Sequence, residues 1–378
     1  MLPVKLKWGV KLEMESRKIC FLALSAYPLL SKQNLGYIVG PDVYQVLLAQ
    51  ELLERGFDVS FITYNEGGSP VEYINGIKVI KTYGRIGRSN LVSKTFHVWE
   101  AMNKAKADVY FQQGGVGAIA PLFCRVKGKR FVSAIASDAY VRKEIKEWGI
   151  LFRLNSELEI KLTDIIVVQS EFQRTMLKRN FGKGSFVIRN PFPVTTRKRP
   201  AKIKPPIVLW VGSIAQVKQP ELFLELARAV PETKFQMIAA IGDDYNYYKK
   251  IKETSKRILN LDFLGFIPFD KVDQYFKHAS ILVNTSKFEG FPNAFIQAWA
   301  NYTPVVSLNS DPDEIICKYK LGFHSKTFNQ LVEDVKTLLK DKKTRQKMGR
   351  NGRLYVEKEH NITKVVDKYI EIFNCLNL

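Results

Sequence analysis

Residues 282–306, LVNTSKFEGFPNAFIQAWANYTPVV, constrain the fold of this chain more than any other stretch. LVNTS, preceded by Ile281, is short, apolar and rich in β-branched residues, which predicts a buried strand. KFEGFPN contains glycine and proline and predicts a loop. Asn293 stands at the position of a helix N-cap, and AFIQAWA has apolar residues at helical spacing. The helix is expected to end near Asn301, and Pro304 then opens a second strand.

This order of elements predicts a binding site for an anion. The first turn of a helix has free backbone N–H groups and a positive dipole end, and a phosphate is their natural ligand. Glu289 lies on the loop before the helix, where its carboxylate can accept hydrogen bonds from sugar hydroxyls. Gln297 follows eight residues later, on the helix. A purely structural helix end remains an alternative, because a carboxylate beside a helix N-terminus occurs in many proteins.

The same stretch resembles the donor-site signature of family 4 retaining glycosyltransferases, which have the GT-B fold. That signature is a glutamate followed by glycine and an apolar residue, a second glutamate eight positions on, and a Thr-Pro-Val-Val strand. Gln297 replaces the second glutamate, which in the family usually holds the ribose hydroxyls. Glutamine still bonds these hydroxyls, but without charge. The resemblance implies a donor-binding segment made of Glu289, Gly290, Phe291, Pro292, Asn293, Ala294 and Gln297.

Two further parts of the second half resemble the family. Gly212 and Lys218 match a strand, glycine and lysine pattern, whereas Ser213 stands where the family often has arginine. In the family the arginine and lysine neutralise the donor diphosphate, so the resemblance implies that more of this charge falls on Lys218. A lone exposed lysine is otherwise usually a solvated surface residue without a specific role. Near Phe266 and Ile267, the resemblance implies a backbone contact with the nucleotide base.

The first half resembles the family more generically. Its opening strand, glycine-containing loop, helix and strand form a βαβ unit. The resemblance implies that the loop with Gly36 and Gly40 lines the acceptor side of a cleft, although a simple tight connection is an equal alternative. A later strand ends at Ser137 and Asp138, where the family often has a His-Asp pair. Only Asp138 is carried over, as a catalytic residue beside Glu289 and Lys218; its alternative is a helix N-cap.

The length of 378 residues predicts two domains, each with its own core. The expected fold class is α/β, GT-B, with two Rossmann-like domains facing each other across a cleft. Proline-rich, basic residues 195–206 predict a linker. The expected organisation is an N-terminal extension 1–17, an acceptor-binding Rossmann-like domain 18–195, a nucleotide-sugar-binding Rossmann-like domain 206–358, and a C-terminal helix 359–378 that crosses back to the first domain. Met14 offers an alternative start.

The formal net charge of +21 favours an anionic partner, such as phosphorylated substrates or an acidic membrane surface. A lysine-rich solvated surface is the alternative. Residues 142–164 are basic and amphipathic, so this segment is expected either to pack on the core or to lie on an anionic membrane. The apolar residues 19–30 are interpreted as a first strand, not as a signal peptide, because Glu13 and Glu15 precede them. No apolar run reaches the roughly 20 residues that span a bilayer. We expect a cytoplasmic protein, with peripheral contact at the cytoplasmic face of the membrane as the alternative.

We expect neither a disulfide framework nor a metal site. Four cysteines and four histidines are dispersed along the chain, with no C-x-x-C pair. Asp311 and Asp313 form a D-x-D sequence, which serves metal and nucleotide binding in the other large glycosyltransferase fold. Here the Asp-Glu-Ile at 313–315 resembles the family's Pro-Glu-Ile loop. The resemblance therefore implies no cofactor and no metal.

The predicted function is that of a retaining glycosyltransferase. It moves a sugar from a nucleotide-sugar donor to a glycan, lipid-linked or other acceptor. A GT-B sugar-nucleotide epimerase or phosphorylase has the same expected fold, but the Glu289 motif favours transfer. An alternative of another class is a catalytically silent protein that binds nucleic acid or an anionic surface. The net charge of the chain favours this alternative, as do Ser137, Ser213 and Gln297, which depart from the family's residues. No nucleic-acid-binding motif is visible in the sequence, which argues against it.

Overall fold

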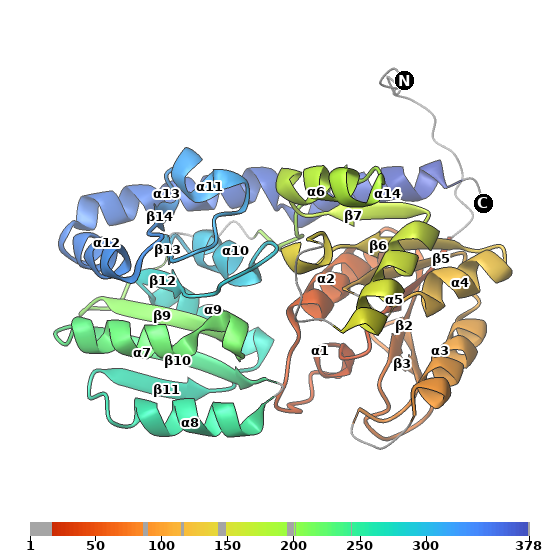
Figure 1. The fold of residues 1–378 in the computed structure, drawn as a ribbon, viewed down its shortest axis with the longest axis horizontal. Helices are drawn as coiled ribbons and strands as arrows, with labels where there is room; N and C mark the ends of the chain where they lie inside the picture. Colours follow the sequence, from red (N-terminus) through yellow and green to blue (C-terminus); the bar gives the residue numbers. More distant parts are fainter. Residues whose placement is uncertain are drawn as a thin grey trace.

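A computed structural model describes residues 17–85, 90–114, 117–142, 149–194, 200, 202–242 and 244–376. The predicted N-terminal extension, apart from Arg17, lies outside the described residues. So do residues 195–199 and 201, half of the predicted linker, and residues 143–148 of the basic amphipathic segment. Two α/β units lie side by side, the first coloured red to yellow-green and the second green to blue (Figure 1).

The first unit is built on an eight-stranded sheet in the order β3-β4-β2-β1-β5-β6-β7-β8. All neighbouring strands are parallel except β3 and β4. Helices cover both faces, which explains why the central strands are almost continuously apolar. The strands are β1 (Lys18–Leu22), β2 (Asp58–Thr63), β3 (Val71–Ile74), β4 (Ile77–Lys81), β5 (Val109–Gln113), β6 (Arg130–Ala134), β7 (Ile165–Val168) and β8 (Phe186–Val187).

The helices of this unit connect successive parallel strands. Helix α2, for example, follows β1 and carries a proline in its first turn, where a missing backbone N–H is tolerated. It ends before Gly56, whose φ of +87° suits glycine. The helices are α1 (Tyr27–Ser31), α2 (Gly40–Glu54), α3 (Leu91–Ala105), α4 (Ile119–Val126), η1 (Asp138–Tyr140), α5 (Ile150–Leu162) and α6 (Glu171–Phe181).

The second unit has a six-stranded sheet in the order β11-β10-β9-β12-β13-β14, with every neighbouring pair parallel. The strand order turns back at β9, so β9 and β12 lie at the centre. In such sheets ligands bind beyond the carboxyl ends of the strands at this point. The strands are β9 (Ile207–Ile214), β10 (Lys234–Ile241), β11 (Leu261–Gly265), β12 (Ile281–Asn284), β13 (Val305–Ser307) and β14 (Gly322–His324).

The order expected for residues 282–306 is confirmed: β12 leads through a loop into α10, which ends at Ala300, and β13 follows. The helices of the second unit are η2 (Gln216–Lys218), α7 (Pro220–Ala229), α8 (Tyr245–Ser255), α9 (Phe269–His278), α10 (Asn293–Ala300), η3 (Pro312–Glu314), α11 (Ile315–Lys318), α12 (Phe328–Lys340) and α13 (Lys342–Glu359).

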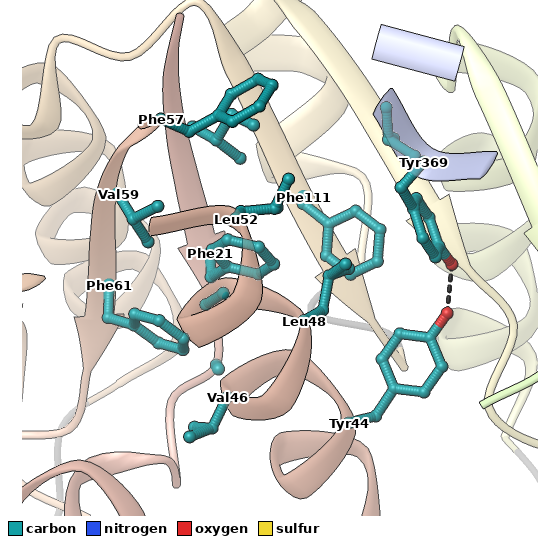
Figure 2. Close-up of a cluster of buried hydrophobic side chains, with 14 of the residues drawn as sticks. Phe21, Tyr44, Val46, Leu48, Leu52, Phe57, Val59, Phe61, Phe111 and Tyr369 are labelled. Carbon is teal, nitrogen blue, oxygen red and sulfur yellow. Dashed lines mark hydrogen bonds between the residues drawn. The ribbon is translucent and has the colours of Figure 1, made fainter. Parts of the chain in front are cut away.

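The predicted crossover helix is present as α14 (Ile362–Cys375), which runs back to the first unit and packs against α2. Its residues Val365, Tyr369 and Phe373 belong to the same buried cluster as the first-sheet side chains of Phe21 and Phe111. The hydroxyls of Tyr44, on α2, and Tyr369 form a buried hydrogen bond (Figure 2). The fold class expected from the sequence, α/β with two Rossmann-like domains and a returning C-terminal helix, is therefore confirmed.

One face of the first domain exposes large apolar side chains. It consists of the neighbouring helices α3, α4 and α5, and we call it the α3–α5 face. Eight of its apolar residues are 42–79% exposed, namely Leu91, Val92, Phe96, Leu122, Val126, Leu151, Leu154 and Leu158. Within the described segments, none of the helices has the length and apolar character that crossing a bilayer requires.

Candidate active site

A cavity of about 680 Å³ lies between the two domains and is lined by residues of both. On the second domain it is lined by residues at the carboxyl ends of the central strands and by the start of α10. On the first domain it is lined by the loop before α2 and by the ends of other strands. Twelve donor-side residues predicted from the sequence line it together with Gly40. They are Gly212, Ser213, Lys218, Phe266, Ile267, Glu289, Gly290, Phe291, Pro292, Asn293, Ala294 and Gln297.

Two predicted site residues do not line this cavity. Gly36 has a φ of +78°, which only glycine adopts without strain, so it serves the turn before α2. Asp138 lines a neighbouring hollow of about 350 Å³, and Glu289 is shared by both. Gly36 thus has a backbone role in the structure, whereas Asp138 lies next to the site.

Lys218 and Glu289 form the charged centre of the cavity. The Lys218 Nζ and Glu289 Oε1 atoms are 2.6 Å apart, and the two side chains are 27% and 11% exposed. Asn284 Nδ2 donates a second hydrogen bond to Glu289 Oε1, at 3.3 Å. Since Lys218 has further N–H donors, it can hold Glu289 and an anionic ligand at once.

A buried hydrogen-bond chain holds the short helix η2 that carries Lys218. The indole Nε1 of Trp210 donates to Thr285 Oγ1 at 3.1 Å, and this hydroxyl donates to the carbonyl oxygen of Lys218 at 2.7 Å. Trp210 is on β9 and Thr285 follows β12. Residues of the two central strands, or directly after them, therefore hold the backbone of Lys218 in place.

Helix α10 begins beside the cavity, but the predicted N-cap role of Asn293 is wrong. Asn293 is the first helical residue, and Pro292 occupies the cap position without a side-chain hydrogen bond. The Asn293 amide is used by the other domain: its Nδ2 donates to the Gly40 carbonyl at 3.0 Å, and its Oδ1 accepts from Asn190 Nδ2 at 2.8 Å. A long-range interaction has replaced a local one.

The donor-side loop touches the first domain at close range. A Cβ atom at Gly290 would lie 2.4 Å from the carbonyl oxygen of Ala136, so only glycine permits this approach. The next amide, of Phe291, donates to Gln169 Oε1 at 2.9 Å. The contacts of Gln169 and Asn190 could not be predicted from the sequence, because nothing local in the chain marks these residues as partners of residues more than 100 positions away.

Asp138 is held by the first domain. Ser137, not Asp138, caps the short helix η1, so the N-cap alternative for Asp138 is wrong. Gln173 Nε2 donates to Asp138 Oδ1 at 3.0 Å. Burial raises the pKa of Asp138 to about 6, with smaller contributions from the negative charges of Asp313 and Glu289.

We expect Asp138→Asn to change the pH dependence of stability. The folded-state pKa of Asp138 is raised from 3.8 to about 6, because burial favours the neutral carboxyl group. The contribution of Asp138 to the free energy of unfolding is therefore fully present below pH 4 and is lost as the pH rises through 6. The variant removes this loss and keeps an acceptor for Gln173. From pH 4 to pH 7 its free energy of unfolding, measured in urea, should rise relative to wild type by on the order of 2–3 kcal/mol. A constant difference across this range would contradict the pKa assignment.

The first-domain wall of the cavity is polar. Gln113, only 5% exposed, lines the cavity, and its Oε1 has no hydrogen-bond partner among the described residues. The Arg85 guanidinium lies 4.0 Å from the centre of the Tyr37 ring, whose hydroxyl donates to Glu66 at 2.6 Å. Buried polar groups normally have partners, so this wall is suited to a ligand with hydroxyl groups. No local sequence signal marks these residues as a group.

The fold and the cavity define a protein of GT-B architecture. Residues 193–355 match the family model described as glycosyl transferases group 1. An uncharacterized glycosyltransferase of Haemophilus influenzae is 22% identical over 356 residues, which cover 89% of this chain and 96% of that protein.

Solved structures agree with this fold. The sucrose-phosphate synthase of Thermosynechococcus elongatus superposes with a TM-score of 0.79 at 17% identity, covering 95% of this chain and 99% of that one. The HepE protein of Anabaena, in complex with UDP and glucose, superposes with a TM-score of 0.71 at 14% identity, covering 95% and 100%. Likeness at these identities establishes the fold. Taken together with the sequence matches, it supports a GT-B glycosyltransferase and sugar transfer in general.

Proposed function

We propose that this protein is a retaining glycosyltransferase that uses a nucleoside-diphosphate sugar. The observation that carries the proposal is the Lys218–Glu289 pair, 2.6 Å apart, beside the first turn of α10 in the cavity between the domains. An ammonium group and a helix N-terminus suit a diphosphate. A carboxylate next to them suits the hydroxyls of the attached sugar. A complex of HepE with UDP and glucose supports the donor class by analogy.

The proposed reaction needs no protein nucleophile. The bond between the anomeric carbon and the phosphate oxygen breaks while the acceptor oxygen bonds to that carbon on the same face. The acceptor proton passes to the departing phosphate oxygen. Negative charge grows on the diphosphate during this step, and Lys218 and the α10 amides stabilise it. Glu289 orients the sugar through its hydroxyl groups, and the polar wall with Gln113 receives the acceptor.

Two donor-side positions are expected to tune this reaction. Ser213 provides a hydroxyl where related enzymes often have a cation, so Lys218 carries most of the diphosphate charge. Gln297 lines the cavity on α10 and provides a neutral partner for the ribose hydroxyls. Both substitutions favour a weaker hold on the nucleotide and leave the sugar-orienting carboxylate intact.

The test is thermal stabilisation of the purified protein by a panel of nucleoside diphosphates and their sugars. A ligand that binds the folded state at 100 times its Kd stabilises it by about 2.7 kcal/mol. We expect one nucleotide sugar to raise the midpoint most. Glu289→Ala should remove the extra stabilisation by the sugar and keep that by the diphosphate. If no nucleotide raises the midpoint, the alternative of a catalytically silent binding protein is favoured.

We further propose that the acceptor is presented at an anionic lipid surface, to which the α3–α5 face binds. Exposed Arg125 and Lys127 adjoin the apolar residues of α4, and Arg153 and Lys161 adjoin those of α5. Exposed leucines bordered by basic side chains are complementary to a bilayer with acidic headgroups. The net charge of +21 acts in the same direction.

Sedimentation with liposomes tests this surface. Wild type should pellet with phosphatidylglycerol-containing vesicles at low salt and much less with purely zwitterionic ones. Leu151→Glu combined with Leu154→Glu should lower the bound fraction several-fold. Leu259→Glu is the matched control, since Leu259 is fully exposed in the second domain. Equal pelleting of all three proteins would contradict the proposal.

A further inference from the structure

Three metal-ligating side chains from different elements converge at the edge of the second sheet. Asp311 precedes η3, Cys317 is on α11, and His324 ends the edge strand β14. Their ligand atoms all lie within 4.8 Å of one another. None of the three lines the cavity that holds Lys218, but Asp311 lines the neighbouring hollow that contains Asp138 and Glu289.

The combination of donor atoms selects a class of metal. A thiolate, an imidazole nitrogen and a carboxylate oxygen are the ligands that Zn²⁺ takes in proteins. Since Zn–S bonds are about 2.3 Å and Zn–N and Zn–O bonds about 2.0 Å, tetrahedral ligand atoms lie roughly 3.3–3.8 Å apart. Side-chain rotations that move the atoms by roughly 1 Å therefore bring all three to bonding distance.

Two observations indicate that the cluster is prepared for a ligand. The Nε2 atom of His324 is buried and has no hydrogen-bond partner among the described residues. An unpaired buried nitrogen is costly, and a metal ion would satisfy it. Asp311 is oriented by backbone amides: Oδ1 accepts from Ile316 at 2.8 Å, and Oδ2 accepts from Cys317 at 3.4 Å. Asp311 also hydrogen-bonds the side chain of Cys317, so a metal ion would take the place of the proton that these two ligands share.

We propose that Asp311, Cys317 and His324 bind one Zn²⁺ ion, with water as the fourth ligand. The ion would join the loop after β13 to the edge strand. The same loop carries Asp313, which accepts hydrogen bonds from the amides of Glu171 and Phe172 at the start of α6. An ion at this position fixes the segment that links the second domain to the first. The proposed role of the ion is structural, and the proposed sugar transfer does not depend on it.

Spectroscopic titration of the tag-free, full-length protein with Co²⁺ tests the site. A cobalt ion bound by a thiolate gives an intense near-ultraviolet charge-transfer band, and Zn²⁺ should displace it at one equivalent. Cys317→Ser should abolish the band, and His324→Gln should weaken Zn²⁺ binding by about 10–100-fold. Cys375→Ser is the matched control, because Cys375 is also exposed and lies on α14, away from the cluster.

A thermal measurement provides an independent readout. Zn²⁺ should raise the unfolding midpoint of wild type and of Cys375→Ser, and leave that of Cys317→Ser unchanged. Circular dichroism identifies any variant that fails to fold. The proposal is overturned if wild type shows no thiolate band with Co²⁺, or if Cys317→Ser binds Zn²⁺ as tightly as wild type.

Discussion

Replacing Lys218 with methionine is expected to lower the rate constant of sugar transfer by about 10²–10³-fold, the effect of removing one group that stabilises developing negative charge. The effect should be large here because Ser213 brings no second cation to the same wall of the cavity. Methionine keeps the length of the side chain and removes its charge. The η2 backbone should be unaffected, because Thr285 holds it through the Lys218 carbonyl.

The measurement is kcat with the donor identified by thermal stabilisation. Lys218→Arg keeps the charge and should retain more activity than the methionine variant. Lys271→Met is the control for loss of one positive charge, since Lys271 is exposed on α9 and does not line the cavity. A rate within a factor of five of wild type for Lys218→Met would mean that the α10 amides alone stabilise the leaving group.

Replacing Trp299 with alanine should destabilise the second domain by about 3–5 kcal/mol, the range for deleting a fully buried large aromatic side chain. Trp299 is 0% exposed, and its ring packs against Phe295 at 5.5 Å and Tyr355 at 5.7 Å between centroids. It also donates from Nε1 to the Leu321 carbonyl at 3.3 Å. Because Trp299 anchors α10, nucleotide binding should weaken as well.

Calorimetry of the wild type and the variant checks this prediction. At roughly 2–4 °C per kcal/mol for a domain of this size, the midpoint of the second domain should fall by roughly 10 °C. Trp299→Phe keeps an aromatic ring but loses the indole hydrogen bond, so its unfolding midpoint should lie between those of wild type and Trp299→Ala. Leu259→Ala removes an apolar side chain that is fully exposed and should change the midpoint by less than about 2 °C. Equal effects of Trp299→Ala and Leu259→Ala would contradict the assigned packing.

Local sequence patterns predicted the elements that build the donor side. Apolar runs with β-branched residues correctly marked β12 and β13, and the glycine and proline of KFEGFPN marked the loop between β12 and α10. Such signals depend only on neighbours in the chain, because hydrogen bonding within a turn and burial of one face follow from a few adjacent residues. Their order along the chain indicated an α/β protein, and the resemblance to family 4 glycosyltransferases implied the GT-B arrangement of two domains.

The tertiary structure determined which distant residues these elements contact. Asn293 reads as an N-cap in the sequence, yet it donates to Gly40 across the cavity, because a partner 253 positions away competes with the local helix end. Asp138 lies in the neighbouring hollow, and Gln113 faces the cavity without a sequence signal.

Local spacing in the sequence was enough to predict the elements β12, α10 and β13, whereas the expected GT-B fold and donor-loop residues came from the resemblance to family 4 glycosyltransferases. Only the tertiary structure decided that Gly290 must be glycine, because the carbonyl it approaches belongs to the other domain. It also brought together Asp311, Cys317 and His324, whose positions in the sequence do not indicate a common site. Contacts of this kind depend on how helices and strands pack, and packing is a property of the whole chain.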